Sequence, residues 1–259
     1  MAETTADSRL TTSIDIDPTW RSWSGVHGGY QAARAAAAGH ALAPGLPLRA
    51  AHAMFTRPVT SATSQLTVEV IRRGATATTL AAQVVPEDRP EAALQMQMLH
   101  GVAGTGPVVD GPPAPDVPAA EQCEPFSLPL ELVPFGQNVE IRPATAARPL
   151  AGGERAELVA WIRILPTGMT PAETFLVLPD ALPPALYGVL ASPLPIPTAD
   201  LAVHLTADAH LAEPAAWYLV LIRTEAARDG WSLDASSVWN ADGQLMALAR
   251  QTRRVLKGA

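Results

Sequence analysis

The sequence is poor in cysteine, with Cys123 the only one, and it has no excess of positive charge. A single cysteine excludes an internal disulfide bond and a cysteine-based zinc site, so Cys123 is expected to fill space in the core. The 18 Lys and Arg residues are outnumbered by 25 Asp and Glu residues, which leaves a formal net charge of -7. We therefore expect no nucleic-acid partner, because phosphate binding requires a basic face.

Long apolar runs and several familiar functional motifs are also missing. No uninterrupted apolar stretch approaches the ~18 residues of a membrane span. The first residues lack the basic and apolar regions of a signal peptide. We therefore expect a cytoplasmic protein without a membrane partner. The absence of a Gly-x-Ser-x-Gly elbow argues against an α/β-hydrolase, and the scattered histidines and the lack of His-Glu-x-x-His predict no metal site and no cofactor.

The 259 residues include 48% hydrophobic residues, which is enough for a sizeable core. An alanine-rich segment at 31–38 predicts a helix. It follows His27, Gly28, Gly29 and Tyr30, and two glycines at a helix start let a ligand approach the free backbone N–H groups. The alternative is that these glycines only allow tight packing of the helix under a sheet. His27 is the one histidine that deserves a functional interpretation, against a structural or surface role.

A second apolar segment, 174–190, is predicted as a helix because it is hydrophobic on nearly every face. It contains one carboxylate, Asp180, with Pro179, Pro183 and Pro184 close by. A lone acid in such surroundings either caps or bends a broken helix or takes part in chemistry.

Strand-like patterns follow each of the two predicted helices. The predicted strands are 10–16, 48–57, 65–73, 78–85, 92–101, 139–142, 157–165, 198–205, 217–224, 232–239 and 245–255. A helix followed by four strands occurs twice, which predicts a tandem duplication and an α+β fold with an antiparallel sheet curled around the helices.

Three regions are predicted along the chain. Residues 10–102 form the first unit, 103–136 form a linker rich in proline and glycine, and 137–256 form the second unit with Asp180. Neither unit is expected to be stable alone, because each would expose a helix face and sheet edges.

Eight short motifs occur in a characteristic order and spacing. They are His-Gly-Gly-Tyr at 27–30, His-Ala-Met-Phe-Thr-Arg-Pro at 52–58, Val-Glu-Val-Ile-Arg-Arg-Gly at 68–74, Val-Glu-Ile-Arg-Pro at 139–143, Asp-Ala-Leu-Pro-Pro-Ala at 180–185, Pro-Thr-Ala-Asp-Leu-Ala-Val-His at 197–204, Trp-Asn-Ala-Asp-Gly-Gln-Leu-Met-Ala at 239–247 and Ala-Arg-Gln at 249–251. Together they resemble the acyl-CoA thioesterase II (TesB-like) family over about 25–255. The resemblance implies a double hotdog with two long helices, each wrapped by one continuous antiparallel sheet, and a cofactor-independent hydrolase of acyl-CoA thioesters.

The resemblance also implies a site. Its catalytic residues would be Asp180, Thr198 and Gln251, with Asp180 deprotonating a water that Thr198 and Gln251 help to position. The residues that bind substrate would be His27, Gly28, Gly29 and Tyr30, although family members often have Gln in place of Tyr30. The N–H groups of the Gly28–Gly29 helix start, or those that begin the second helix, would polarise the thioester carbonyl.

Two alternatives stay open. One is another thioester-directed activity on the same scaffold, such as hydration or dehydration of an enoyl thioester or a biosynthetic step, although no histidine closely follows Asp180 in the sequence. The other is a protein that binds acyl thioesters without hydrolysing them. Arg72, Arg73, Arg250, Arg253, Arg254 and Lys257 could bind coenzyme A phosphates or could equally be solvated strand ends. A homo-oligomer assembled through sheet edges is expected.

Overall fold

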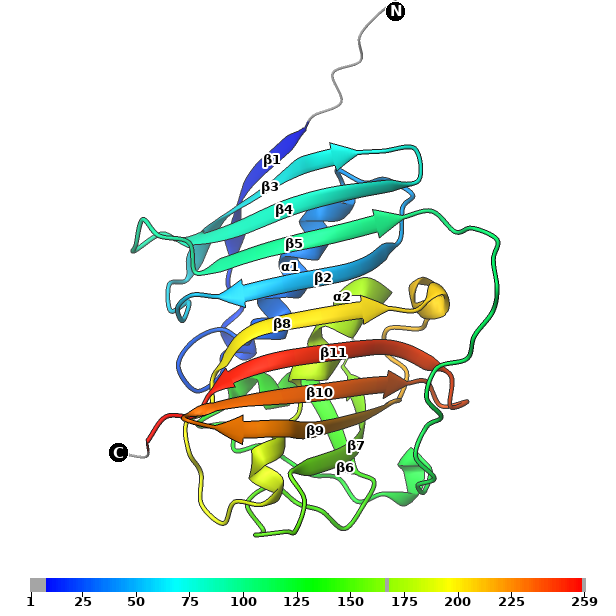
Figure 1. Cartoon of the computed structure of the whole chain (residues 1–259). Coiled ribbons are helices and arrows are strands. Elements are labelled where there is room, and N and C mark those ends of the chain that lie inside the picture. Colours follow the sequence, from blue (N-terminus) through cyan, green and yellow to red (C-terminus); the bar gives the residue numbers. More distant parts are fainter. Residues whose placement is uncertain (1–7, 166–167, 258–259) are drawn as a thin grey trace, which may run out of the picture.

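The computed structural model describes residues 8–165 and 168–257, which form one antiparallel sheet with two helices behind it in the view of Figure 1. The helices are α1 (Gly28–His40) and α2 (Pro171–Val177). The strands are β1 (Arg9–Asp15), β2 (Leu48–Phe55), β3 (Thr63–Arg73), β4 (Ala77–Pro86), β5 (Leu94–Gly101), β6 (Val139–Pro143), β7 (Glu157–Ile164), β8 (Thr198–Leu205), β9 (Tyr218–Arg228), β10 (Trp231–Trp239) and β11 (Leu245–Arg254). Each predicted strand is present, and the α+β class with a large antiparallel sheet is confirmed.

The two halves of the chain have the same strand order. The order is β1-β3-β4-β5-β2 in the first half and β7-β9-β10-β11-β8 in the second, with β6 added outside β7. The halves join where β2 pairs with β8, from Ala50 opposite His204 to Met54 opposite Asp200. The repeated order supports a duplication, and the double-hotdog organisation and the exact unit boundaries remain predictions.

The core of the first half depends on small residues in α1. Ala32, Ala33, Ala35 and Ala36 are at most 4% exposed, and they allow the helix to lie close to the inner face of the sheet. That inner face is formed by alternate residues of each strand, because successive side chains of a strand point to opposite faces. The alanine-rich segment thus forms a helix because alanine has a high helix propensity, and its small side chains let the helix pack closely on the sheet.

The prediction of one long helix at 174–190 is wrong. α2 ends at Val177 and continues only as a 3-10 turn at Leu178–Asp180, and a separate 3-10 turn follows at Ala185–Gly188. The prolines explain the break, because they lack the N–H that an α-helix requires and their rings crowd the preceding turn. With 7 residues in α2 and 13 in α1, the expected pair of long helices is not found. No helix in the described part of the chain is long and apolar enough to span a bilayer.

Part of the predicted linker packs on the outer face of the second half (Figure 1). Trp161 Nε1 donates to the Pro118 carbonyl at 2.8 Å, and Trp239 Nε1 donates to the Pro112 carbonyl at 2.9 Å. Cys123 is buried in the same cluster, as expected for a filler residue. Residues 112–123 of the predicted linker therefore cover part of the sheet.

The first turn of α1 lies directly against the end of α2. A Cβ atom added at Gly29 would lie 2.7 Å from the Leu176 carbonyl oxygen and 3.0 Å from Val177 Cα. These are backbone atoms, so they cannot move aside as a flexible side chain would. Tight packing was expected under a sheet, whereas at Gly29 the close contact is with α2.

Gly29→Ala is expected to lower the free energy of unfolding by about 1–3 kcal/mol, because the added methyl group overpacks the contact between the helices. Chemical denaturation of the purified variant would measure the change. Gly104→Ala is the matched control, because nothing lies within 4 Å of its added Cβ. Equal stability of Gly29→Ala and Gly104→Ala would contradict the tight contact.

Candidate functional site

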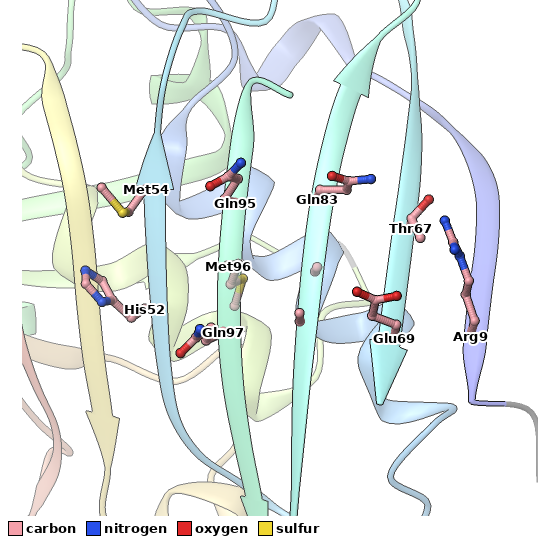
Figure 2. Close-up of a pocket in the computed structure, with 11 residues that line it drawn as sticks. Arg9, His52, Met54, Thr67, Glu69, Gln83, Gln95, Met96 and Gln97 are labelled. Carbon is pink, nitrogen blue, oxygen red and sulfur yellow. The ribbon is translucent and has the colours of Figure 1, made fainter. Parts of the chain in front are cut away.

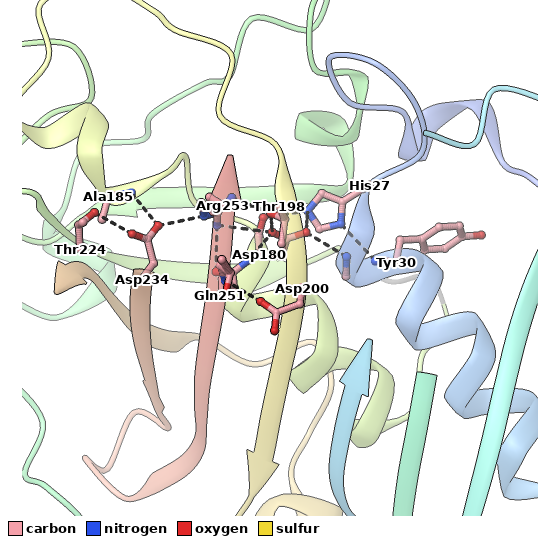
Figure 3. A network of polar contacts seen from close by, with 12 residues as sticks. His27, Tyr30, Asp180, Ala185, Thr198, Asp200, Thr224, Asp234, Gln251 and Arg253 are labelled. Carbon is pink, nitrogen blue, oxygen red and sulfur yellow. Dashed lines mark hydrogen bonds and ion pairs between the residues drawn. The ribbon is translucent and has the colours of Figure 1, made fainter. Parts of the chain in front are cut away.

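Asp180 lies at the end of the 3-10 turn that follows α2, and its side chain is only 7% exposed. Its Oδ1 accepts hydrogen bonds from Gln251 Nε2 at 2.7 Å and from Thr198 Oγ1 at 3.2 Å, and its Oδ2 accepts from the Gly29 amide at 3.0 Å (Figure 3). The structure thus brings together the three residues predicted as catalytic. It also places one of the predicted glycines in direct contact with the carboxylate.

Strand geometry places Thr198 and Gln251 next to each other. Gln251 is 1% exposed and points to the inner face of β11. The pairing of β11 with β8 shifts register between Thr252 and Arg253, so that Arg253 pairs with Thr198 at the start of β8. Such an irregularity re-aims side chains locally, and here it accompanies the inward orientation of Thr198.

His27 connects the start of α1 to the backbone of Asp180. Its Nδ1 accepts a hydrogen bond from the Tyr30 amide at 3.2 Å and so caps the helix. The neutral ring must then carry its proton on Nε2, which donates to the Asp180 carbonyl oxygen at 2.9 Å. The same Nε2 lies 3.5 Å from Asp180 Oδ2. His27 is therefore buried beside the carboxylate.

Gly28 and Tyr30 have different surroundings, although they belong to the same predicted motif. A Cβ at Gly28 would lie 3.0 Å from the Phe55 ring and 3.1 Å from Asp180 Oδ2, and the Gly28 amide donates to none of the described residues. The Tyr30 ring points away from Asp180 in Figure 3 and stacks on Trp20 with a centroid distance of 4.6 Å. Burial raises the pKa of the Tyr30 phenol. The structure therefore brings Gly28 to Asp180 and leaves Tyr30 outside the site.

The amides that begin α2 do not reach the candidate site. Thr170 and Glu173 form a capping box at that end of the helix, with the Glu173 carboxylate accepting from the Thr170 amide at 2.8 Å. Asp180 follows the opposite end of α2. Of the two predicted sources of a polarising N–H, only the start of α1 lies at the carboxylate.

Sequence reasoning missed the role of Arg253, which was grouped with exposed basic residues. Arg253 is 4% exposed; its Nη1 donates to Thr198 Oγ1 at 2.7 Å and its Nη2 donates to Gln251 Oε1 at 2.9 Å. The exposed-tail and phosphate-binding interpretations are therefore wrong for Arg253. The available signal was its spacing of two residues from Gln251, which places both side chains on one face of a strand.

Asp234 is the second missed residue. Its side chain is fully buried, and its Oδ2 lies 2.9 Å from Arg253 Nε. Thr224 Oγ1 donates to Asp234 Oδ1 at 2.7 Å, and the Ala185 amide donates to Oδ2 at 3.4 Å. The inner face of β10 and β11 thus contains an ion pair that continues to Asp180 through Thr198 and Gln251.

Two hollows on the surface lie apart from this network. One of about 480 Å³ is on the outer face of the first half, and Figure 2 shows polar side chains along it, including Glu69, Gln83 and Gln97. The other, of about 530 Å³, is lined by residues that include Asp208 and Trp217. Neither is lined by Asp180, Thr198 or Gln251. The described residues also contain no group of three or more His, Cys, Asp or Glu side chains that could hold a metal ion.

Comparison with family models gives two matches that together cover most of the chain. The model of the acyl-CoA thioesterase C-terminal domain matches residues 109–255, and that of the N-terminal domain matches residues 16–101. No curated protein matches the chain.

Solved structures share the fold at low sequence identity. A hot dog fold protein of unknown function from Alicyclobacillus acidocaldarius has a TM-score of 0.83 at 20% identity, over 98% of this chain and 96% of that chain. A tesB protein from Mycobacterium avium subs paratuberculosis has a TM-score of 0.76 at 17% identity, over 98% and 96%. The acyl-CoA thioesterase II TesB2 from Mycobacterium marinum has a TM-score of 0.67 at 18% identity, over 91% and 92%. These structures support a hotdog-type fold.

His27→Ala is expected to lower the free energy of unfolding by about 1–2 kcal/mol, because α1 loses its capping acceptor. Thermal or chemical unfolding measures the loss. His27→Asn keeps a capping oxygen and should retain most of the stability. An alanine variant as stable as the wild type would show that the cap contributes nothing.

Proposed function

Because the chain belongs to the acyl-CoA thioesterase family and is a thioester hydrolase, we propose that it hydrolyses an acyl-CoA to the free acid and coenzyme A at Asp180. The observation that carries this proposal is a nearly buried carboxylate with hydrogen-bond donors from both halves of the chain. Gly29 contributes from α1, and Thr198 and Gln251 contribute from β8 and β11. Such a carboxylate is fixed in place before substrate arrives, which favours catalysis by orientation.

The hydrogen bonds favour Oδ2 of Asp180 as the oxygen that holds the attacking water. Each carboxylate oxygen offers about two acceptor positions. Both positions of Oδ1 are used by Thr198 and Gln251, whereas Oδ2 accepts only the Gly29 amide and lies 3.5 Å from His27 Nε2. In the proposed mechanism Thr198 and Gln251 therefore hold the carboxylate, which refines the expectation that they hold the water.

The reaction then follows general base catalysis. Asp180 accepts a proton from the water as the water oxygen bonds to the thioester carbonyl carbon. The Gly28 amide, at the first position of α1, would stabilise the negative charge on the carbonyl oxygen. The carbon–sulfur bond breaks, and the thiolate of coenzyme A takes the proton from Asp180. The products are the carboxylic acid and the free thiol.

Hydration or dehydration of an enoyl thioester is the second candidate, and one observation favours it. No histidine follows Asp180 closely in the sequence, yet the fold places His27 Nε2 at 3.5 Å from its carboxylate. A histidine and a carboxylate side by side can exchange a proton with a substrate carbon or hydroxyl group. Both ring nitrogens of His27 already have hydrogen-bond partners, however, which favours the structural role.

Asp180→Asn is expected to reduce kcat by at least about a hundredfold, because the amide cannot accept the water proton. The side chain keeps its size, so the variant should fold. Steady-state kinetics on an acyl-CoA would measure the loss, with Asp208→Asn in the 3-10 turn Ala207–Leu211 as an exposed control. Wild-type turnover by folded Asp180→Asn would remove Asp180 from the mechanism.

A panel of acyl-CoA substrates of increasing chain length tests the function itself. We expect release of free thiol, measured with a thiol reagent, for at least one chain length. Enoyl-CoA and 3-hydroxyacyl-CoA belong in the same panel, with the ultraviolet absorbance of the conjugated thioester as the readout. Interconversion of these two without thiol release would favour the hydratase. Tight binding without any turnover would favour a protein that only binds acyl thioesters.

A further inference from the structure

We propose that Arg253 is a positioning residue, which sets the direction of the hydrogen bonds around Asp180 and is itself held by Asp234. The inference rests on the proposed role of Asp180. Arg253 is 3.6 Å from Asp180 Oδ1 at its nearest, so its main contacts are with the two neutral side chains that hold the carboxylate. Its effect on Asp180 therefore passes through Thr198 and Gln251.

The direction of each hydrogen bond follows from the chemistry of the guanidinium group, which can only donate. Because Arg253 Nη1 donates to Thr198 Oγ1 at 2.7 Å, this oxygen acts as the acceptor. The hydroxyl hydrogen of Thr198 is then free to point at Asp180 Oδ1, 3.2 Å away. The threonine hydroxyl could otherwise rotate and accept or donate in several directions.

Gln251 is fixed by the same logic. Its amide oxygen and nitrogen have almost the same shape, so the group could turn over by half a rotation. Arg253 Nη2 donates to Oε1 at 2.9 Å, which leaves Nε2 directed at Asp180 Oδ1 at 2.7 Å. A reversed amide would place nitrogen against guanidinium and oxygen against carboxylate, and both contacts would be repulsive. One guanidinium thus determines the orientation of two donors.

Asp234 provides the opposing anchor for Arg253. Its Oδ2 lies 2.9 Å from Arg253 Nε, and its own position is fixed by Thr224 and the Ala185 amide. A buried ion pair is weak support for stability, since desolvation offsets much of the attraction. Its contribution is instead to hold the guanidinium beside Thr198 and Gln251 by charge attraction, because Arg253 Nε lies 2.9 Å from Asp234 Oδ2 without making an aligned hydrogen bond to any described residue.

Arg253→Lys separates orientation from charge. Lysine keeps the positive charge but has one nitrogen, so it cannot serve Thr198, Gln251 and Asp234 in the planar arrangement of the guanidinium. We expect kcat for acyl-CoA hydrolysis to fall about a hundredfold, because Asp180 would no longer be held in the orientation that catalysis needs. KM should change less than about threefold. A kcat within about threefold of the wild type would overturn the proposal.

Arg223→Lys is the matched control. Arg223 lies on β9, and its side chain is 57% exposed and pairs with Glu225. This variant should keep kcat within about twofold. If Arg223→Lys lost as much activity as Arg253→Lys, the loss would not be specific to the buried network, and the proposal would be wrong.

A double variant guards against a folding defect. Arg253→Gln combined with Asp234→Asn removes both charges of this buried ion pair, so neither member is left without its partner. It should fold, as judged by circular dichroism and a cooperative thermal transition, and still show the loss in kcat. Wild-type kcat in this folded double variant would overturn the positioning role.

Nuclear magnetic resonance of the Gln251 side-chain amide tests the orientation without any turnover. The two amide proton signals, identified by their absence in Gln251→Glu, should be well dispersed and slow to exchange in the wild type, and should move toward the values of a free amide in Arg253→Lys. Unchanged signals would refute the proposal. A wild type without acyl-CoA hydrolysis would instead refute the proposed function, so the two failures can be told apart.

Discussion

The site depends on one buried carboxylate that accepts hydrogen bonds from both halves of the chain. Burying Asp180 would be costly without partners, and Gly29, Thr198 and Gln251 supply them. The Gly29 amide comes from α1, while the other two donors come from β8 and β11. Packing of α1 against α2 and pairing of β2 with β8 hold these elements together. Neither half could therefore build this arrangement alone.

Much of the fold could be predicted from local patterns. The strands follow from alternation and the first helix from alanine propensity, because both signals are short-range. The prediction of one continuous second helix was wrong because the apolar pattern was given more weight than Pro179, Pro183 and Pro184. These prolines interrupt the helix and were visible in the sequence. The trio of Asp180, Thr198 and Gln251 came from family resemblance. Periodicity alone would not have selected those residues.

What could not be predicted depends on contacts between distant segments. Arg253 is buried because of its partners on β8 and β10, and a terminal run of arginines gives no sign of those partners. The orientation of Tyr30 follows from Trp20, which lies outside the helix. His27 lies beside Asp180 across the junction of the two halves. The absence of a histidine shortly after Asp180 in the sequence therefore did not exclude a pair of histidine and aspartate in the fold.

The pairing of β2 with β8 also has a consequence for the order in which the molecule folds. It joins residues near 50 to residues near 204, so a long segment of chain must close into a loop when the pairing forms, and pairings of this kind form slowly. Among Asp180 and its three hydrogen-bond donors, Gln251 comes last along the chain. During synthesis the first half is made long before β11 emerges, and Asp180 is expected to lack its nearest donor until then. Assembly of the site is therefore tied to the final steps of folding.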